Sequence, residues 1–423
     1  MTDAGAPAGP VTSAGVARVG AATVLTAICG YAVLYLAARA LNPVGFSMFG
    51  VFWGAIGLVG GAASGLLQEA TREVRASRCA GSVGPATSDT GAAGGPFTRP
   101  MRVAAGVGTA AAVILVGTAP LWAPQVFVEA RMLSVGLLAT FLTGFCLHST
   151  LLGMLAGVGQ WTQYAALMVT DAIIRVSIAV AAFLAGWGLV GFLWVTLGGT
   201  VAWLLLLILS PTTRAAAGLR TPGGTRTFLR GAAHSIAATG ASAILVMGFP
   251  VLLKATSGEL GAAGGVVILA VTLTRAPLLV PLTAMQGNLI AYFVDRRGHR
   301  LRALLGPTSI VAGLGAVGVL AAGLFGPWLI RIAFGAHYEL SGALLAWLTA
   351  AAVSISMLSI TGAAAVAAAL HRAYSLGWVG ATVASALLLT LPLDLSTRTV
   401  VALLCGPLVG IAVHLAALAR AAR

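Results

Sequence analysis

The sequence has very few charged residues for its length. Only 8% of its 423 residues are charged, against roughly 25% in an ordinary soluble domain. Hydrophobic residues make up 59% of the chain, and the mean hydropathy is +1.00. A chain of this composition has too little polar surface to coat a water-soluble globule, so a soluble enzyme is excluded.

Acidic residues and lysine are especially scarce. The chain has 10 Asp or Glu residues against 24 Lys or Arg residues, a net charge of +14, and Lys254 is its single lysine. The arginines are scattered between apolar runs, whereas basic nucleic-acid-binding proteins gather their cations on a polar face. We therefore expect no nucleic-acid partner and interpret the basic excess as a signal of membrane topology.

Motifs for a metal, a disulfide or a nucleotide are missing as well. Cys29, Cys79, Cys146 and Cys405 show neither metal-ligand spacing nor a paired pattern. No GxxxxGK[ST] loop occurs, so we expect no ATP hydrolysis. The predicted outer loops are too short for a membrane glycosyltransferase. We expect no cofactor, no metal and no enzymatic activity.

Long apolar runs are what the sequence does contain. A transmembrane helix needs about 20 mostly apolar residues. Twelve runs fit this length and predict an all-α polytopic membrane protein with about twelve transmembrane helices. They are 19–41, 46–68, 103–122, 133–157, 162–186, 189–210, 236–254, 263–292, 303–326, 340–365, 374–392 and 398–419.

The distribution of the cations predicts the orientation of these helices. With a cytoplasmic N-terminus, seventeen cations fall on the inside, and seven fall in the spans or at their outer ends. This asymmetry is typical of the positive-inside rule. We predict a multi-pass protein of the bacterial cytoplasmic membrane with both termini in the cytoplasm. The seven other cations are Arg39, Arg131, Arg175, Lys254, Arg275, Arg331 and Arg398.

The chain is predicted to consist of two halves. We expect a disordered cytoplasmic N-terminus at 1–17, a six-helix bundle at 18–210, a cytoplasmic linker with four arginines at 211–235, and a second six-helix bundle at 236–423. A weak internal similarity supports the division, since LAGVGQWTQYAAL at 155–167 and AAALHRAYSLGWV at 367–379 lie 212 positions apart. Repeated halves are a common plan of transporters.

Three charged residues lie well inside predicted spans, where each costs about 2.5 to 3.5 kcal/mol on insertion scales. Asp171 and Arg175 are four residues apart on one helix face, so they form an internal ion pair or line a hydrated cavity in which Arg175 contacts an anion. Arg275 has no acid in its own span and is followed by Pro277 and Pro281. We expect its partner to come from another helix, from water or from a ligand phosphate, and we expect the prolines to kink the helix.

Weaker candidates for substrate contact surround these charges. Gln286 and Asn288 follow Arg275, and interhelical hydrogen bonding is their alternative role. Arg39 lies at an outer helix end, where its side chain contacts a ligand or reaches the interface. His148 is either a proton relay or a packing residue. Separately, Gly57, Gly61 and Gly65 recur every four residues, a spacing that permits close helix packing.

Four stretches of the sequence resemble a known family. They are AARALNPVGFSMFGVF at 37–52, LLGMLAGVGQWTQYAALMVTDAIIR at 151–175, TRAPLLVPLTAMQGNLIAYF at 274–293 and LIRIAFGAHYELSGALLAWL at 329–348. In order and spacing they are similar to the polysaccharide-biosynthesis flippases, of the Wzx and MurJ type, of the multidrug/oligosaccharidyl-lipid/polysaccharide (MOP) exporter superfamily. The chain departs from that pattern at Asn42, where glycine is usual.

The resemblance implies two six-helix bundles in a V whose central cavity opens alternately to the two sides. It implies a transporter that flips a polyprenyl-(pyro)phosphate-linked sugar or oligosaccharide, with Arg39, Arg175 and Arg275 as the cations that meet the pyrophosphate. The expected partners are this glycan lipid, membrane lipids and cell-envelope glycosyltransferases, and we expect a monomer.

Two other functions remain open. One is a MATE-like drug/cation antiporter of the same superfamily, although such proteins generally need acidic residues in the membrane, and Asp171 is the only one well inside a span. The other is a non-transporting membrane scaffold for cell-wall enzymes, which would use the arginine-rich segments 211–235 and 292–302 to hold a partner or anionic lipid.

Overall fold

The protein is almost entirely helical. The computed structural model describes residues 13–79, 97–296, 300–335 and 337–421. The helices of the first half of the chain are α1 (Ser13–Ala40), α2 (Pro43–Cys79), α3 (Pro100–Gly117), α4 (Ala119–Val126), α5 (Arg131–Val158), α6 (Trp161–Leu184), α7 (Gly188–Gly198), the 3-10 turn η1 (Gly199–Val201), α8 (Ala202–Leu209) and α9 (Pro211–Ala217). Two short strands, β1 (Phe97–Thr98) and β2 (Thr221–Pro222), form an antiparallel pair.

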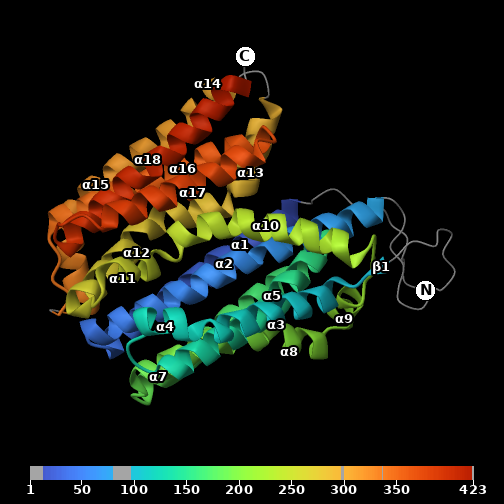
Figure 1. Ribbon diagram of the computed structural model, residues 1–423, viewed down its shortest axis with the longest axis horizontal. Coiled ribbons are helices and arrows are strands. Elements are labelled where there is room, and N and C mark those ends of the chain that lie inside the picture. The colour runs from blue at the N-terminus through green and yellow to red at the C-terminus, as the bar shows by residue number, and fades with distance from the viewer. Residues whose placement is uncertain (1–12, 80–96, 297–299, 336, 422–423) are drawn as a thin grey trace. The chain divides into compact units, whose positions relative to one another are not determined.

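The second half continues with helices of similar length. They are α10 (Thr225–Val246), α11 (Phe249–Ser257), α12 (Gly261–Ala284), α13 (Gln286–Asp295), α14 (Arg300–Ala303), α15 (Leu305–Phe334), α16 (Gly342–Ala367), α17 (His371–Leu389) and α18 (Leu395–Ala421). Figure 1 shows their arrangement along the chain.

The helices of the described residues account for eleven of the twelve predicted membrane spans. Among the described residues, ten helices are long and apolar enough to cross a membrane, and the pair α10 and α11, bent by 63°, forms a broken eleventh span. The remaining predicted span, 374–392, corresponds to α17, which begins with the polar residues His371 and Arg372 and falls outside this set. The prediction of an all-α polytopic membrane protein is confirmed.

The chain divides into two compact units. The first contains the described residues up to Leu36 and Ile56–Gly240, and the second contains Ala37–Ala55 and Ala241–Arg423 as far as they are described. Helices α1, α2 and α10 therefore contribute to both units. The segment 211–235, interpreted from the sequence as a linker, holds α9, β2 and the start of α10. Of the segment 1–17, residues 1–12 lie outside the described residues, and α1 begins at Ser13.

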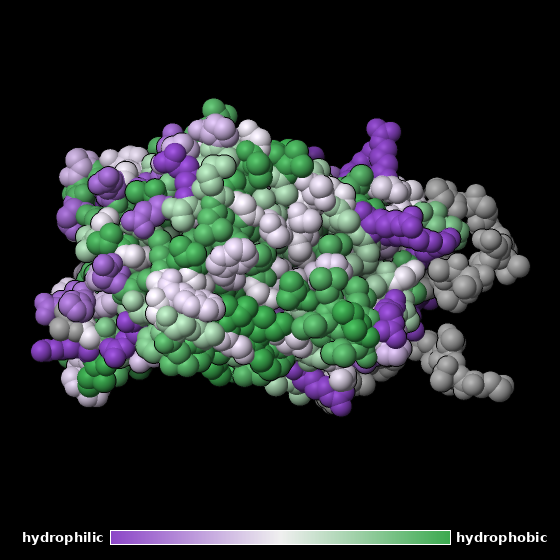
Figure 2. Space-filling model, turned by 90° about the horizontal axis from the view of Figure 1, so that it is seen from below, coloured by the Kyte–Doolittle hydropathy of each residue, from purple (hydrophilic) through white to green (hydrophobic). Residues whose placement is uncertain are grey.

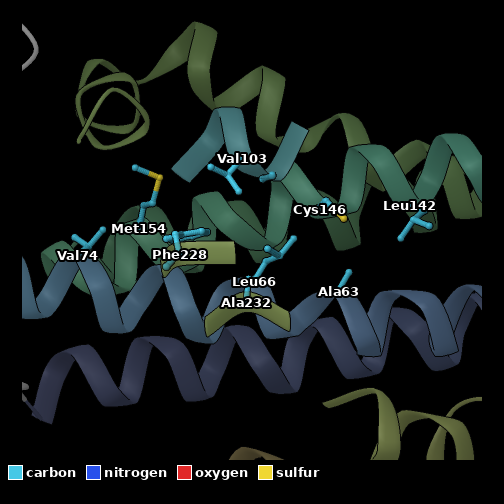
Figure 3. Close-up of a cluster of buried hydrophobic side chains, with 11 residues drawn as sticks. Ala63, Leu66, Val74, Val103, Leu142, Cys146, Met154, Phe228 and Ala232 are labelled. Atoms are coloured by element: carbon cyan, nitrogen blue, oxygen red, sulfur yellow. The ribbon is translucent and has the colours of Figure 1, made fainter. Parts of the chain in front are cut away.

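The first unit is built around an apolar cluster on α2, α3, α5 and α10. Figure 3 shows these side chains meeting between the helices. Leu66 of α2 and Met154 of α5 are fully buried, and Phe228 of α10 is almost fully buried. Because these residues come from distant parts of the sequence, their burial fixes the four helices to one another. The labelled members are Ala63, Leu66, Val74, Val103, Leu142, Cys146, Met154, Phe228 and Ala232.

Small residues let the backbones of this unit approach closely. A methyl group at Gly65 of α2 would lie 2.6 Å from the Cα atom of Ile236 on α10. On α5, a methyl group at Gly153 would lie 3.0 Å from the Cα atom of Leu67 on α2. Close packing of small residues is the usual way in which membrane helices associate. The structure confirms the close approach predicted for Gly65.

In the second unit, α15, α16, α17 and α18 lie side by side (Figure 1). Small residues again mediate the contact, since a methyl group at Gly410 of α18 would lie 3.1 Å from Cβ of Ala381 on α17. Only 6% of the apolar window of α15 is buried, so most of its side chains are available to lipid. Figure 2 shows one face of the molecule on which hydrophobic side chains form much of the outer surface.

The two halves share a turn with the same hydrogen bonds. The amide of Gln160 donates to the carbonyl of Leu155, and the amide of Leu370 donates to that of Ala365, both at 2.9 Å. The preceding residues, Gly159 and Ala369, both have positive φ, at 80° and 60°. The same turn recurs elsewhere, since the amides of Trp187 and Gly248 donate to the carbonyls of Ala182 and Ala243. The internal repeat stays a prediction.

We predict that Gly65→Ala destabilises the protein by about 1 to 3 kcal/mol because the new methyl group overpacks the α2–α10 contact. The matched control is Gly136→Ala on α5, where an added Cβ meets no atom within 4 Å. The measurement is thermal unfolding in detergent. Equal unfolding temperatures for the two variants would contradict the close contact.

Candidate functional site

The first unit contains an ion pair on α6, between two of the residues singled out from the sequence. The Arg175 Nη2 atom donates to Oδ1 of Asp171 at 3.0 Å. Asp171 is 8% exposed, and Arg175 is partly buried. The structure thus confirms that the four-residue spacing joins the two side chains, and Asp171 faces protein rather than lipid.

Other elements of the unit enclose this pair. The guanidinium of Arg175 lies 6.0 Å from the centre of the Phe141 ring on α5. On the other side is Gly199, in the 3-10 turn η1 between α7 and α8, where an added methyl group would collide with Oδ1 of Asp171 and Nε of Arg175. A residue without a side chain therefore leaves the space that the pair occupies. Sequence reasoning missed Gly199 because nothing local distinguishes it among 55 glycines.

His148 of α5 belongs to the same surroundings. It is 4% exposed, its ring is stacked on Phe145 with centroids 5.6 Å apart, and it interacts electrostatically with Asp171 and Arg175. Among the described residues, its Nδ1 atom has no hydrogen-bond partner. A buried imidazole with an unused nitrogen beside a charged pair can accept or release a proton.

His414 of α18 shows what a packing histidine looks like in this protein. Its Nδ1 atom is 3.0 Å from Oγ1 of Thr361, and its Nε2 atom is 3.2 Å from the carbonyl oxygen of Tyr374. Both nitrogens are used, and the ring is fully buried. His414 is thus a packing residue, and the unused Nδ1 atom of His148 distinguishes the two histidines.

In the second unit, Arg275 of α12 holds the break between α10 and α11. Its Nη1 atom donates to the carbonyl oxygens of Leu245 at 3.4 Å and Val246 at 3.1 Å, and its guanidinium lies 5.1 Å from the centre of the Phe249 ring. The last carbonyls of a helix lack intrahelical partners and carry partial negative charge. Arg275, which is 7% exposed, therefore satisfies the end of α10. The partner expected from another helix is present.

The remaining sequence candidates are exposed. Gln286 and Asn288 lie in the first turn of α13, and Arg39 lies in the last turn of α1. Helix α12 continues through Pro277 and Pro281 to Ala284. The predicted interruption thus comes after Ala284, where α12 ends and α13 begins.

The six candidates are divided between the units. Asp171 and Arg175 belong to the first, and Arg39, Arg275, Gln286 and Asn288 belong to the second. The structure brings Asp171 and Arg175 together, with His148 beside them. No group of three or more potential metal-ligating side chains occurs in the part of the chain that the structure describes.

We predict that Gly199→Ala destabilises the protein by about 2 kcal/mol or more, because the methyl group displaces a buried, bonded charge pair. The penalty should vanish in the background Asp171→Ala/Arg175→Ala, which removes the atoms that it meets. Thermal unfolding of the four proteins measures this difference. A penalty of the same size in both backgrounds would show that Gly199 serves another contact.

Comparison with known proteins identifies close sequence relatives. No protein-family model matches the chain. In Mycobacterium tuberculosis (strain H37Rv), uncharacterized protein Rv3630 is 68% identical over 98% of the chain and 94% of its own length. Uncharacterized protein Rv1510 of the same strain is 65% identical over 99% and 96%.

Solved transporter structures share the fold. An inward-facing multidrug resistance MATE family transporter of the MOP superfamily has a TM-score of 0.70 and 15% identity, covering 96% of this chain and 98% of that one. An outward-facing MATE transporter has a TM-score of 0.64 and 17% identity, covering 96% of each chain. A MOP superfamily transporter from Pyrococcus furiosus, described as having a binding pocket of reverse polarity, has a TM-score of 0.60 and 16% identity, covering 97% of this chain and 96% of that one. The chain therefore belongs to the same family as Rv3630 and Rv1510, and its fold is that of the MATE transporters of the MOP superfamily.

Proposed function

We propose that this chain is a membrane transporter that flips an anionic lipid-linked substrate, of the polyprenyl-(pyro)phosphate-linked glycan class, across the bacterial cytoplasmic membrane by alternating access. The fold it shares with inward- and outward-facing transporters supports the transport part of the proposal. The positive-inside distribution of the arginines supports cytoplasmic termini. Cell-envelope glycosyltransferases are proposed as its functional partners.

The ion pair between Asp171 and Arg175 is the reason for proposing an anionic substrate. Asp171 is a buried carboxylate inside the candidate span of α6, and its Oδ1 atom already accepts from Arg175. A cationic drug or a coupling cation would have to displace this guanidinium from a buried carboxylate, which is costly because a charge would be left unpaired. A phosphate, by contrast, can bind the N–H groups of Arg175 that remain accessible, since the side chain of Arg175 is 18% exposed.

The other candidate residues have different proposed roles in transport. Arg39, Gln286 and Asn288 are exposed and can reach a substrate head group. Arg275 holds the broken span of α10 and α11. Discontinuous membrane helices often form the binding regions of transporters, so its carbonyl contacts serve transport by keeping this break in place.

A MATE-like drug/cation antiporter is the second candidate, because multidrug transporters share the fold. The two functions differ in which member of the ion pair is essential. An anion transporter needs Arg175, whereas a cation antiporter needs Asp171.

The test is flux through the purified protein in proteoliposomes. We predict protein-dependent translocation of a fluorescent polyprenyl-pyrophosphate-linked sugar, reduced about tenfold by Arg175→Gln through loss of one charge-assisted contact of about 1.4 kcal/mol. Asp171→Asn should keep most of the flux per folded protein. Arg331→Gln, at the exposed end of α15, is the matched control and should leave the flux unchanged.

A parallel assay with a cationic dye decides between the candidates. Dye transport that depends on an ion gradient and is abolished by Asp171→Asn, without lipid flux, would overturn the proposal in favour of an antiporter. Absence of flux for both probes would favour a membrane scaffold.

A further inference from the structure

A groove in the first unit collects three arginines that the transport site does not use. It has a volume of about 680 Å³ and lies between the strand β1, the first turns of α3 and the start of α10. Its polar end is formed by Arg99, Arg102 and Arg220, and no carboxylate lies among its described lining residues.

The short sheet brings these arginines together. Thr98 of β1 pairs with Thr221 of β2, and Oγ1 of Thr98 donates to the carbonyl oxygen of Gly223 at 2.7 Å. This pairing places Arg220, which directly precedes β2, beside Arg99, the N-cap residue of α3. Arg99 and Arg220, 121 positions apart in the sequence, thus face one groove because the two strands pair.

The three positive charges are close enough to repel one another. The charges of Arg102 and Arg220 lower the pKa of Arg99, which lies before the first residue of α3. The Nε atom of Arg220 has no hydrogen-bond partner among the described residues. Membrane topology explains cations at this end of α3, but it does not require three of them to share one groove. Like charges gathered around an open space favour an anionic ligand.

The rest of the groove is apolar. Val103, Gly106, Val107 and Ala110 line it at helical spacing along one face of α3, and Leu229 of α10 lies opposite. From Arg99 to Ala110 the helix rises about 16 Å. A methyl group added at Gly106 would meet no atom within 4 Å, so this stretch of the groove is open space. The groove is therefore cationic at one end and apolar along its length.

The position of α3 identifies the surroundings of the groove. The helix is one of the candidate membrane spans, and the arginines lie at its beginning. The cationic end thus lies at the level of the lipid head groups, and the apolar end runs into the hydrocarbon region.

We propose that this groove binds one anionic phospholipid, with its phosphate at the three arginines and the upper part of an acyl chain along α3. The apolar length distinguishes this ligand from a free anion, which would use the arginines alone. The inference is independent of the transported substrate, because none of its residues belongs to the proposed transport site.

The test is lipid binding to the delipidated protein in detergent, measured by native mass spectrometry. The probes are phosphatidylglycerol, phosphatidylcholine with the same acyl chains, and glycerol phosphate. We expect phosphatidylglycerol to bind at least about tenfold more tightly than the other two probes. The double variant Arg102→Gln/Arg220→Gln should lose this preference.

A second variant tests the acyl chain without changing any charge. Gly106→Leu fills the open part of the groove and should weaken phosphatidylglycerol binding about tenfold while leaving glycerol phosphate binding unchanged. Arg230→Gln, an exposed α10 residue outside the groove, is the control for loss of charge and should bind like the parent.

Two results would overturn the proposal. One is phosphatidylglycerol affinity within twofold of the parent in both the arginine and the Gly106 variants. The other is glycerol phosphate binding as tightly as the lipid, which would show a site for a free anion. The unfolding temperature of each variant, measured in the same detergent, separates loss of binding from loss of fold.

Discussion

Buried charge in an apolar surrounding must be compensated within the protein, and this constraint organises both units of the chain. In the first unit, the carboxylate of Asp171 takes its partner from Arg175, one turn further along α6. In the second, Arg275 takes its partners from the carbonyl end of α10. Both arrangements depend on a further feature of the chain. The ion pair needs the space left by the missing side chain of Gly199. The carbonyls that Arg275 binds are available because α10 ends where the span is broken.

The same constraint underlies the function that we propose. Drug and cation exporters generally need acidic residues in the membrane, and here the buried carboxylates of Asp171 and Glu69 each already accept from a guanidinium. A chain that keeps its arginines in excess is better suited to an anionic head group than to a cation. The lipid that we propose for the groove on α3 is anionic as well, because Arg99, Arg102 and Arg220 line this groove together.

Local patterns in the sequence predict much of this structure, and long-range contacts account for the rest. Hydropathy predicts the spans, and a spacing of four predicts the pair at Asp171, because both follow from helix geometry alone. The break between α10 and α11 lies 29 residues from Arg275, so its carbonyls leave no local signal beside that residue. The arginine groove depends on strand pairing between distant segments.

The most direct test of the account is a double-mutant cycle on Asp171→Asn and Arg175→Gln, with the free energy of unfolding measured in mixed micelles. If compensation of buried charge governs the site, each single variant loses about 2 to 4 kcal/mol, and the double variant recovers much of the loss, with a coupling energy of about 2 kcal/mol. Additive effects, with a coupling energy below about 0.5 kcal/mol, would contradict the account.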